Sequence, residues 1–389
     1  MAEILWNTTT KIYFGEGVTE EAIQKEAELF SGVIMIVTSG TSIDRLGHVD
    51  RLIRYIEQYG HPELLRVYGA ISQNPRLEDI AKAAVEARQM KADTIIGFGG
   101  GSALDAAKAV AVGAALMVES DQDMLEQLEQ YMMDGNEPGK STKSVIAIPT
   151  TAGTGSEVSK AAIISSKRLK IKGGIRGDHI VPVLAIVDPE YTWSVSEKVT
   201  METGFDVFAH AMESYAAVKA NSYSEMLSEQ AIRLVGENLP RLKKDSQDHI
   251  ARRQMSYASL LMGMNLASVG TCLPHRIQYP VGARTGTTHA AGLAAIYPSW
   301  IFHEYQVNAA KVTRGIELLT GTRVENAREA AEAMTAFLRE LEIDYSLNEL
   351  GITDGELKEL AEEVTGNIAN DKLANQSDIM IRIIADRRE

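Results

Sequence analysis

The hydrophobic pattern of the chain changes near residue 188, and this change limits the folds that the chain can adopt. Before it, continuous apolar runs of the kind that favours strands alternate with segments of helical periodicity. The runs span residues 33–39, 64–69, 94–99, 144–150 and 183–192, and the helical segments span 49–59, 77–90 and 103–117. Apolar strands separated by helices are typical of a parallel sheet covered on both faces. The first half therefore predicts a doubly wound α/β domain.

After residue 188, apolar residues recur three and four positions apart almost to the end of the chain, which predicts an all-α domain. Asp188 and Pro189 mark the joint, because a proline disfavours helical geometry in the residue before it. A chain of 389 residues is also long enough for two hydrophobic cores. We therefore expect an α/β domain over residues 1–188 and a helical domain over residues 189–389.

The composition excludes several classes of function. A net charge of −14, with 39 basic against 53 acidic residues, argues against a nucleic-acid partner, since neutralising phosphates needs an excess of lysine and arginine. No apolar run reaches the roughly 18 residues of a membrane-spanning helix, and the first residues do not resemble a signal peptide. The single cysteine, Cys272, excludes an internal disulfide and fits a reducing compartment. We expect a cytoplasmic protein without a membrane partner.

A glycine-rich segment, TIIGFGGGSALDAAKAVAV, connects the apolar run at 94–99 to the next helix. It contains Gly97, Gly99, Gly100, Gly101 and Ser102. Backbone N–H groups at such a helix start point toward one spot, and the missing Cβ atoms let a pyrophosphate come close. The segment is not the GxGxxG fingerprint, and a tight strand-to-helix turn without a ligand explains it equally well.

A second loop, PTTAGTGSE at 149–157, combines hydroxyl side chains with glycines directly after the next strand. Loops at the carboxyl ends of neighbouring parallel strands are where such sheets bind ligands, so the two loops together favour a nucleotide. The strand at 33–39 ends without the acidic residue that would bond an adenine ribose and repel a 2′-phosphate. Its small neutral residues, Ser39, Gly40, Thr41 and Ser42, leave room for NADP. A surface loop without nucleotide contact is the alternative.

Four residues of the second half form a candidate metal site. Asp206 and His210 are four apart on a predicted helix and therefore share a face, although such a pair alone is more often incidental. His275 and His289 lie near a helix end and after a glycine-containing loop. Three nitrogens and one oxygen without a thiolate suit a divalent transition metal such as iron or zinc. The remaining histidines are expected to be solvated: His48, His61, His179, His249 and His303.

These segments resemble the iron-containing, group III alcohol dehydrogenase family, within the wider dehydroquinate synthase and glycerol dehydrogenase superfamily. The likeness runs through KIYFGEG, QNPRLED, GFGGGSALDAAKAVA, IAIPTTAGTGSEVS, TGFDVFAHAMESY and YPVGARTGTTHAAGLAAIYPSW, nearly the whole chain. It implies a dinucleotide-binding α/β domain, a helical metal-binding domain and a reaction in the cleft between them.

The resemblance also assigns roles position by position. The metal ligands of the family match Asp206, His210, His275 and His289. Its nucleotide-binding residues match Gly100, Gly101, Ser102, Asp105, Thr150, Thr151, Thr154 and Lys172. Ser39, followed by Gly40, occupies the place of the acidic residue of NAD-preferring members, as in members that prefer NADP.

One position departs from the family. Members commonly carry a further histidine four residues after the third ligand, immediately before PLG, where this chain has Tyr279 in YPVG. A phenol can donate a hydrogen bond near the metal, but with an ordinary pKa of about 10 it transfers protons poorly at neutral pH. Packing against the cleft wall is the other interpretation of Tyr279. Lys160, Arg276 and Arg284 are candidates for holding an anionic aldehyde, with surface or nucleotide contacts as the alternative.

We therefore expect a metal-dependent, NAD(P)-linked alcohol dehydrogenase or aldehyde reductase that transfers hydride reversibly between the nicotinamide and a small-molecule substrate. Fe²⁺ is the favoured metal, with Zn²⁺ as the alternative, and NADP(H) is favoured over NAD(H). We also expect a homodimer or a higher homo-oligomer. Two other functions stay open: a lyase or cyclase that uses NAD transiently, as dehydroquinate synthase does, and a non-catalytic module that binds nucleotide and metal.

Overall fold

The structure is a computed structural model that describes residues 9–40, 46–72, 74–118, 120–169 and 171–385. The described residues form two compact units. One, called the α/β unit below, comprises residues 9–151 and 155–195. The other, the helical unit, comprises residues 152–154 and 196–385.

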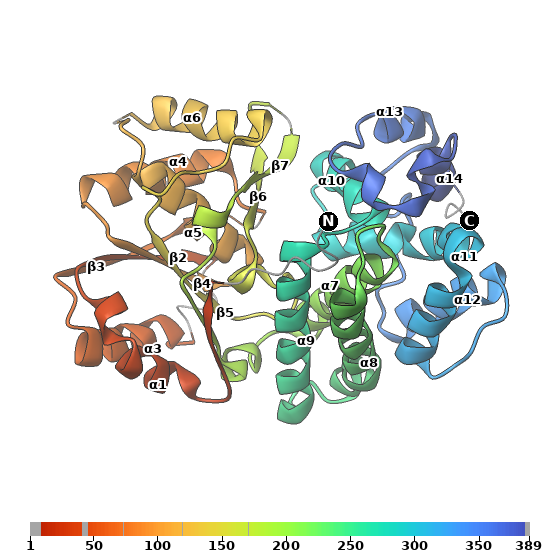
Figure 1. The fold of residues 1–389 in the computed structure, drawn as a ribbon, viewed down its shortest axis with the longest axis horizontal. Coiled ribbons are helices and arrows are strands. Elements are labelled where there is room, and N and C mark those ends of the chain that lie inside the picture. Colours follow the sequence, from red (N-terminus) through yellow and green to blue (C-terminus); the bar gives the residue numbers. More distant parts are fainter. Residues whose placement is uncertain (1–8, 41–45, 73, 119, 170, 386–389) are drawn as a thin grey trace. The chain divides into compact units, whose positions relative to one another are not determined.

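The α/β unit contains the predicted parallel sheet (Figure 1). Its strands are β1 (Lys11–Phe14), β2 (Val33–Ser39), β3 (Leu64–Ile71), β4 (Thr94–Gly99), β5 (Ser144–Pro149) and β8 (Leu184–Val187). They are paired in parallel in the order β1-β8-β5-β4-β2-β3. All residues of β4 are buried, as expected of a strand covered on both faces. The predicted α/β fold is confirmed.

Helices cover both faces of this sheet (Figure 1). One face packs against α1 (Val18–Lys25) and α3 (His48–Tyr55), and the other against α4 (Leu77–Gln89), α5 (Gly101–Ala114) and α6 (Asp121–Asp134). The alternation of a strand explains this division, since Ile34 and Ile36 face one set of helices while Met35 and Val37 face the other. An antiparallel pair, β6 (Ala161–Ser166) and β7 (Ile171–Arg176), lies outside the main sheet.

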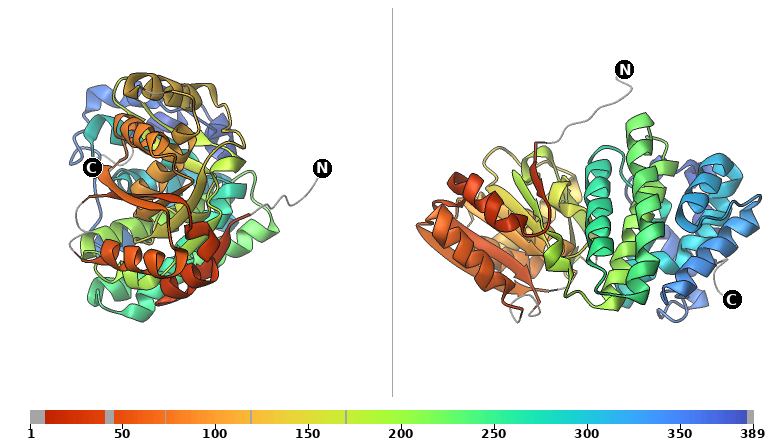
Figure 2. Two further views of the ribbon diagram at one scale, coloured as in Figure 1. Left: turned by 90° about the vertical axis from the view of Figure 1, so that its left-hand side faces the viewer. Right: turned by 90° about the horizontal axis from the view of Figure 1, so that it is seen from below.

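The helical unit confirms the predicted all-α second half. Its helices are α7 (Glu197–Ala216), α8 (Ser222–Lys244), α9 (His249–Ser268), α10 (Leu273–Thr285), α11 (His289–Thr320), α12 (Ala327–Glu340), α13 (Leu357–Glu362) and α14 (Ile379–Ala385). α7, α8 and α9 run side by side (Figure 2). Phe205 and Phe208 of α7 pack edge-on against Tyr297 of α11. Among the described residues, no helix combines the length and the apolar character that crossing a membrane requires.

Short helical turns join these elements. They are η1 (Ala27–Phe30), η2 (Ile56–Gly60), η3 (Ser156–Val158), η4 (Asp178–Ile180), η5 (Pro189–Thr192), η6 (Asp354–Glu356), η7 (Ile368–Asn370) and η8 (Lys372–Asn375). The helical unit resumes at Ser196, the N-cap of α7, rather than at the predicted joint after Asp188. Residues after Asp188 stay with the sheet because Tyr191 is buried against Phe98 of β4, with ring centroids 5.0 Å apart.

Candidate functional site

Three helices of the helical unit carry the four predicted metal ligands. Asp206 and His210 lie one turn apart on α7, as their spacing predicts. His275 lies in the first turn of α10, and His289 is the first residue of α11. Thr288 caps α11 through its side-chain oxygen, which fixes the start of the helix that bears His289.

The three imidazoles surround one carboxylate oxygen. The Nε2 atoms of His275, His289 and His210 are 3.5, 3.6 and 3.8 Å from Oδ1 of Asp206. Ligand atoms bound about 2.1 Å from one tetrahedral ion lie roughly 3.4 Å from one another. Ligand atoms of Asp206, His210 and His275 all lie within 4.8 Å of one another, so these three fit a shared divalent metal. His289 joins them through its 3.6 Å approach to Asp206. Asp206, His210 and His275 are buried, whereas 25% of the His289 side chain is exposed. His289 is therefore the most exposed of the four predicted ligands.

Three buried atoms of this group make no hydrogen bond among the described residues: Asp206 Oδ1, His210 Nδ1 and His275 Nε2. Asp206 Oδ1 and His275 Nε2 face each other at 3.5 Å. A buried polar atom left unpaired costs about 1–3 kcal/mol, and more when it is charged. A cation would satisfy both atoms at once, so the residues present fit a metal.

The charges of these residues act strongly on one another. Burial raises the pKa of Asp206, but the charges of His210 and His289 outweigh burial and hold that pKa well below its usual range. Burial lowers the pKa of His210, and Asp206 opposes the shift. Burial also acts to lower the pKa of His275, but Glu213 and Asp206 raise it to about 10. The carboxylate is therefore ionised at neutral pH, the form that binds a metal.

Two buried residues outside the predicted site contact the rings of predicted ligands. Oε1 of Glu213 is 2.6 Å from Nδ1 of His275, and Oε1 of Gln278 contacts Nδ1 of His289. Glu213 follows His210 by three residues on α7, and Gln278 follows His275 by three on α10. Helical spacing puts each residue on the ligand-bearing face of its own helix, but the ring that it contacts belongs to another helix, which the local sequence does not indicate.

The glycine-rich segment forms the turn between β4 and α5. Gly99 has a φ of 153°, and a Cβ there would lie 2.8 Å from the Cβ of Ala103, so this position needs glycine. Gly100 is the N-cap of α5 and supplies no side-chain cap. The helix then begins with Gly101 and Ser102. A helix start without a side-chain cap suits an anion, which can accept the first N–H groups.

The strand order brings further predicted nucleotide residues to the same edge of the sheet. β5 and β2 flank β4 in the sheet. β5 ends directly before Thr150 and Thr151, and β2 ends at Ser39. Thr150 donates its N–H to the carbonyl of Gly99 at 2.9 Å. Ser39 Oγ lies 3.7 Å from the position that a Cβ would take on Gly99. The carboxyl edge of a parallel sheet is where α/β domains bind ligands.

The other predicted nucleotide residues have varied surroundings. Gly40 has a φ of 71° and open space around it, while Thr41 and Ser42 lie outside the described residues. Thr154 groups with the helical unit, together with Gly153, whose N–H donates to Ser259 Oγ.

Asp105 bonds to protein groups through both carboxylate oxygens. Oδ1 accepts a hydrogen bond from Ser156 Oγ at 2.5 Å, and Oδ2 accepts one from Ile163 N–H at 2.9 Å. Lys108, one turn later on α5, donates to the same serine at 2.8 Å. The positive charge of Lys172, on β7, also acts on Asp105. These contacts attach Ser156 and Ile163, which follow or end the loop at 149–157, to α5. A direct contact of Asp105 with the nucleotide stays a prediction.

Similarity to known proteins extends over both units. The family model described as iron-containing alcohol dehydrogenase matches residues 9–189, and the model of the C-terminal part of that family matches residues 200–385. Long-chain-alcohol dehydrogenase 1 of Geobacillus thermodenitrificans is 30% identical over 356 residues, which are 90% of this chain and 87% of that protein. The chain belongs to the iron-containing alcohol dehydrogenase family.

Relatives differ in length. The aldehyde-alcohol dehydrogenase of Streptococcus pneumoniae serotype 2 is 31% identical over 355 residues, or 85% of this chain, but the match spans only 39% of that relative. A solved structure of an archaeal halo-thermophilic alcohol dehydrogenase from a Red Sea brine pool is 26% identical. It matches with a TM-score of 0.89 over 99% of this chain and 98% of its own. This likeness agrees with the predicted family fold.

Tyr279, at the position where family members commonly have a histidine, lies beside the predicted ligand His289. Its ring centroid is 6.4 Å from that of His289, and its side chain is half-buried. The guanidinium carbon of Arg276 is 5.4 Å from the centre of the Tyr279 ring. This location is compatible with a hydrogen bond to substrate, and the role of Tyr279 stays a prediction.

Two of the three basic residues proposed for an anionic substrate already face acids. Lys160 is 3.7 Å from Asp178. Arg284 forms ion pairs with Glu356, Glu359 and Glu363. Arg284 therefore fits the surface-contact alternative, because these carboxylates offset its charge. Arg276 donates to Thr271 Oγ1 at 3.1 Å and remains the best placed of the three.

The expectation that five histidines are solvated is wrong for His303. It lies in α11 with only 5% of its surface exposed, because the helix is enclosed by the core at this point. Burial also lowers the pKa of His48. The exposed members are His61, His179 and His249.

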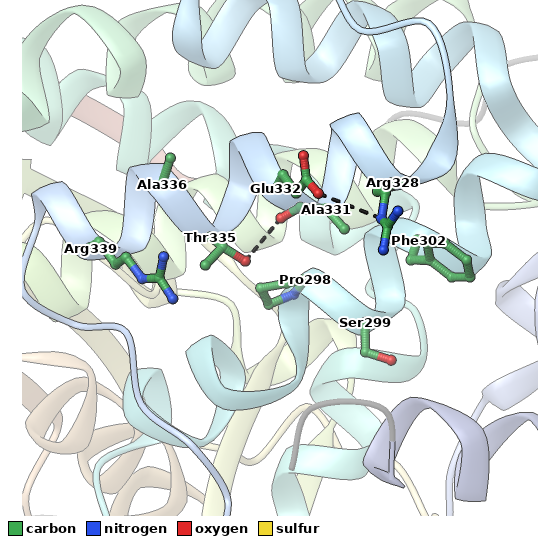
Figure 3. A pocket seen from close by; sticks show the side chains of 9 residues that line it. All are labelled: Pro298, Ser299, Phe302, Arg328, Ala331, Glu332, Thr335, Ala336 and Arg339. Atoms are coloured by element: carbon green, nitrogen blue, oxygen red, sulfur yellow. Dashed lines mark hydrogen bonds and ion pairs between the residues drawn. The ribbon is translucent and has the colours of Figure 1, made fainter. Parts of the chain in front are cut away.

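A cavity of about 510 Å³ lies between α11 and α12 (Figure 3). None of the predicted metal ligands lines it. Its two arginines face acids, since Arg328 pairs with Glu332 at 3.6 Å and Arg339 pairs with Asp344 at 2.9 Å. The cavity therefore offers no free positive charge to an anion.

Proposed function

We propose that this chain is a metal-dependent, NAD(P)-linked alcohol dehydrogenase that also reduces aldehydes. The observation that carries the proposal is the convergence of three imidazole Nε2 atoms, 3.5–3.8 Å from Asp206 Oδ1. A bound divalent metal supplies Lewis-acid polarisation of a carbonyl oxygen, and a bound nicotinamide supplies the hydride. Fe²⁺ is the metal we favour, with Zn²⁺ as the alternative, because the donors are imidazole and carboxylate without a thiolate.

The residues of the chain bind and orient the reactants. Asp206, His210, His275 and His289 would hold the metal. The backbone N–H groups at the start of α5 would bind the pyrophosphate, with the positive end of the helix behind them. Thr150, Thr151, Thr154 and Lys172 are proposed to complete the nucleotide site. Tyr279 is the candidate for a hydrogen bond to the substrate oxygen.

Loss of one ligand should remove both metal and activity. We expect Asp206→Ala and His275→Ala to lose the metal and to lower kcat/KM with NADPH and an aldehyde by at least about 10³-fold. Metal content is measured by mass spectrometry, and turnover by the fall in NADPH absorbance. The exposed His249→Ala is the matched control and should retain both. Full turnover in Asp206→Ala would refute the site.

Ser39 is proposed to favour NADPH. A carboxylate at this position would bond the ribose 2′-hydroxyl of NADH and repel the 2′-phosphate of NADPH. Ser39→Asp should therefore lower kcat/KM with NADPH by at least about 10-fold relative to NADH. Equal rates of the unmodified enzyme with both nucleotides would contradict this preference.

The substrate class is proposed to include anionic aldehydes, with Arg276 as their anchor. A panel of neutral, carboxylated and sulfonated aldehydes tests this directly. Arg276→Gln should raise KM for the anionic members and leave KM for the neutral members nearly unchanged.

We also propose that the protein forms a homodimer or a higher homo-oligomer. Light scattering after size exclusion would measure its oligomeric state.

A further inference from the structure

Glu213 makes two contacts that converge on one metal ligand. It lies on α7 and is fully buried. Oε1 is 2.6 Å from Nδ1 of His275, and Oε2 accepts a hydrogen bond from the backbone N–H of Cys272 at 2.8 Å. Cys272 is the N-cap of α10, so one carboxylate holds both the imidazole and the start of the helix that carries it.

The first contact determines which ring nitrogen is available. A carboxylate can only accept, so Nδ1 of His275 must carry the hydrogen. When His275 gives up its second proton to bind a cation, the remaining hydrogen stays on Nδ1 and Nε2 presents its lone pair. Nε2 lies 3.5 Å from Asp206 Oδ1. An anionic acceptor behind the ring also makes Nε2 more electron-rich, which strengthens its bond to a cation.

His289 has a different partner. Its Nδ1 faces Oε1 of Gln278, a neutral amide. Gln278 is fully buried, and its side chain fills space that exists only because residues 282 and 292 are glycines. A Cβ on Gly282 would lie 2.8 Å from its Nε2, and one on Gly292 would lie 3.0 Å from its Cγ. The amide is therefore held in place by packing, although it adds no charge.

We propose that Glu213 and Gln278 are positioning residues that set the tautomers of His275 and His289 and grade their strength as ligands. This proposal rests on the proposed metal site. The charged acceptor makes the buried His275 the tightly held ligand, and the neutral acceptor makes the more exposed His289 the weaker one. Neither residue contacts the metal itself.

Exchanging the two acceptors tests the proposal without reference to turnover. Glu213→Gln should weaken Zn²⁺ affinity, measured by competition with a chelator, by about 10–100-fold. Gln278→Glu places an anion behind His289 and should tighten Zn²⁺ binding. The control is Glu237→Gln on α8, whose carboxylate is exposed and pairs with Arg233. Circular dichroism establishes that each variant is folded.

A spectroscopic measurement separates positioning from a general loss of stability. In Zn²⁺-loaded protein labelled with ¹⁵N-histidine, the Nδ1–H of His275 should give a slowly exchanging resonance. It should be lost or strongly shifted in Glu213→Gln and unchanged in Glu237→Gln. If Glu213→Gln does not fold, Gln278→Glu decides, because it leaves the contacts of Glu213 intact.

The outcomes distinguish this proposal from the proposed function. It is overturned if folded Glu213→Gln binds Zn²⁺ as tightly as the wild type and keeps the resonance, or if folded Gln278→Glu gains no affinity. Wild-type protein with the expected affinities and spectra but without aldehyde reduction would refute the activity and support the positioning roles. Unchanged metal binding in Asp206→Ala would refute both.

Discussion

Glu304 illustrates how a single buried side chain makes stability depend on pH. It lies in α11 with 1% of its surface exposed, and Asn308 donates to its Oε1 at 3.0 Å. Burial raises its pKa from 4.5 to about 8, and Asp371 adds to the shift, while Asn308, Lys372 and Lys311 oppose it. The folded chain therefore holds this proton more tightly than the unfolded chain does.

The shift of Glu304 predicts a window of pH in which stability is lost. The stability that the folded chain gains from binding this proton is fully present below about pH 4.5 and is lost as the pH rises to about 8. Glu304→Gln stays neutral and keeps the acceptor, so it should be more stable than the wild type by about 1–3 kcal/mol at pH 8.5 and nearly equal near pH 5. Urea unfolding at both pH values measures the difference. Glu332 is exposed on α12, so Glu332→Gln is the control. If the free energy of unfolding depended on pH in the same way in the wild type and in Glu304→Gln, the prediction would be wrong.

Sequence patterns identify site residues that lie close together along the chain, but they do not show which side chains from different helices contact one another. Asp206 and His210 share a turn of α7, and His275 and His289 stand out in one short glycine-containing segment, so the four could be selected before the family resemblance assigned them as ligands. The contact of Glu213 with His275 joins α7 to α10, and no local pattern encodes that meeting.

At the element scale, Lys108 ties a helix to a loop. Its Nζ lies 2.8–3.1 Å from four oxygens, on Ser156, Ser159 and Ala161. The side chain is fully buried, and burial lowers its pKa to about 8 against the opposing charges of Asp105 and Glu157. The lysine therefore holds residues 156–161, which follow the second nucleotide loop, against α5.

Removing this lysine should affect both stability and nucleotide binding. Lys108→Met leaves buried oxygens unpaired and removes a positive charge that acts on both Asp105 and Glu157, so we expect a loss of about 3 kcal/mol or more in the free energy of unfolding. The KM for NADPH should rise, because the second loop is no longer held. Lys82→Met, exposed on α4, is the matched control. An unchanged urea midpoint for Lys108→Met would show that the network does not support the loop.

The elements that sequence could not predict are those that depend most on their surroundings. The apolar runs at 33–39, 64–69, 94–99 and 144–150 appear as strands, whereas the run at 183–192 is a strand only over Leu184–Val187 and then forms the turn η5. β1 has only four residues, and its pairing with β8 sets its register. The hairpin of β6 and β7 packs against α5 and α6, and Gly173 and Gly174 weaken its strand pattern. The joint was predicted at a proline, whereas burial of Tyr191 extends the α/β unit to residue 195.

At the scale of the whole molecule, each unit has its own hydrophobic core and its own set of predicted ligand residues. The predicted metal ligands belong to the helical unit, as does Thr154 of the predicted nucleotide site, whereas the glycine turn, Thr150 and Thr151 belong to the α/β unit. A ligand stabilises the structure that binds it by RT ln(1 + [L]/Kd), about 2.7 kcal/mol at a hundredfold excess over Kd. Metal and nucleotide should therefore protect different parts of the chain.

Hydrogen exchange measured by mass spectrometry tests this division. Zn²⁺ should slow amide exchange in α7, α10 and the start of α11 by up to about 100-fold, while NADPH should slow it at the β4–α5 turn and the end of β5. Asp206→Ala should abolish the effect of Zn²⁺ and leave the effect of NADPH, because its change is confined to the metal ligands. If Zn²⁺ slowed exchange equally in β4 and in α7, the two cores would unfold as one cooperative system. Stability gained from the metal would then also support the nucleotide loops, so a metal-free preparation would show weakened NADPH binding.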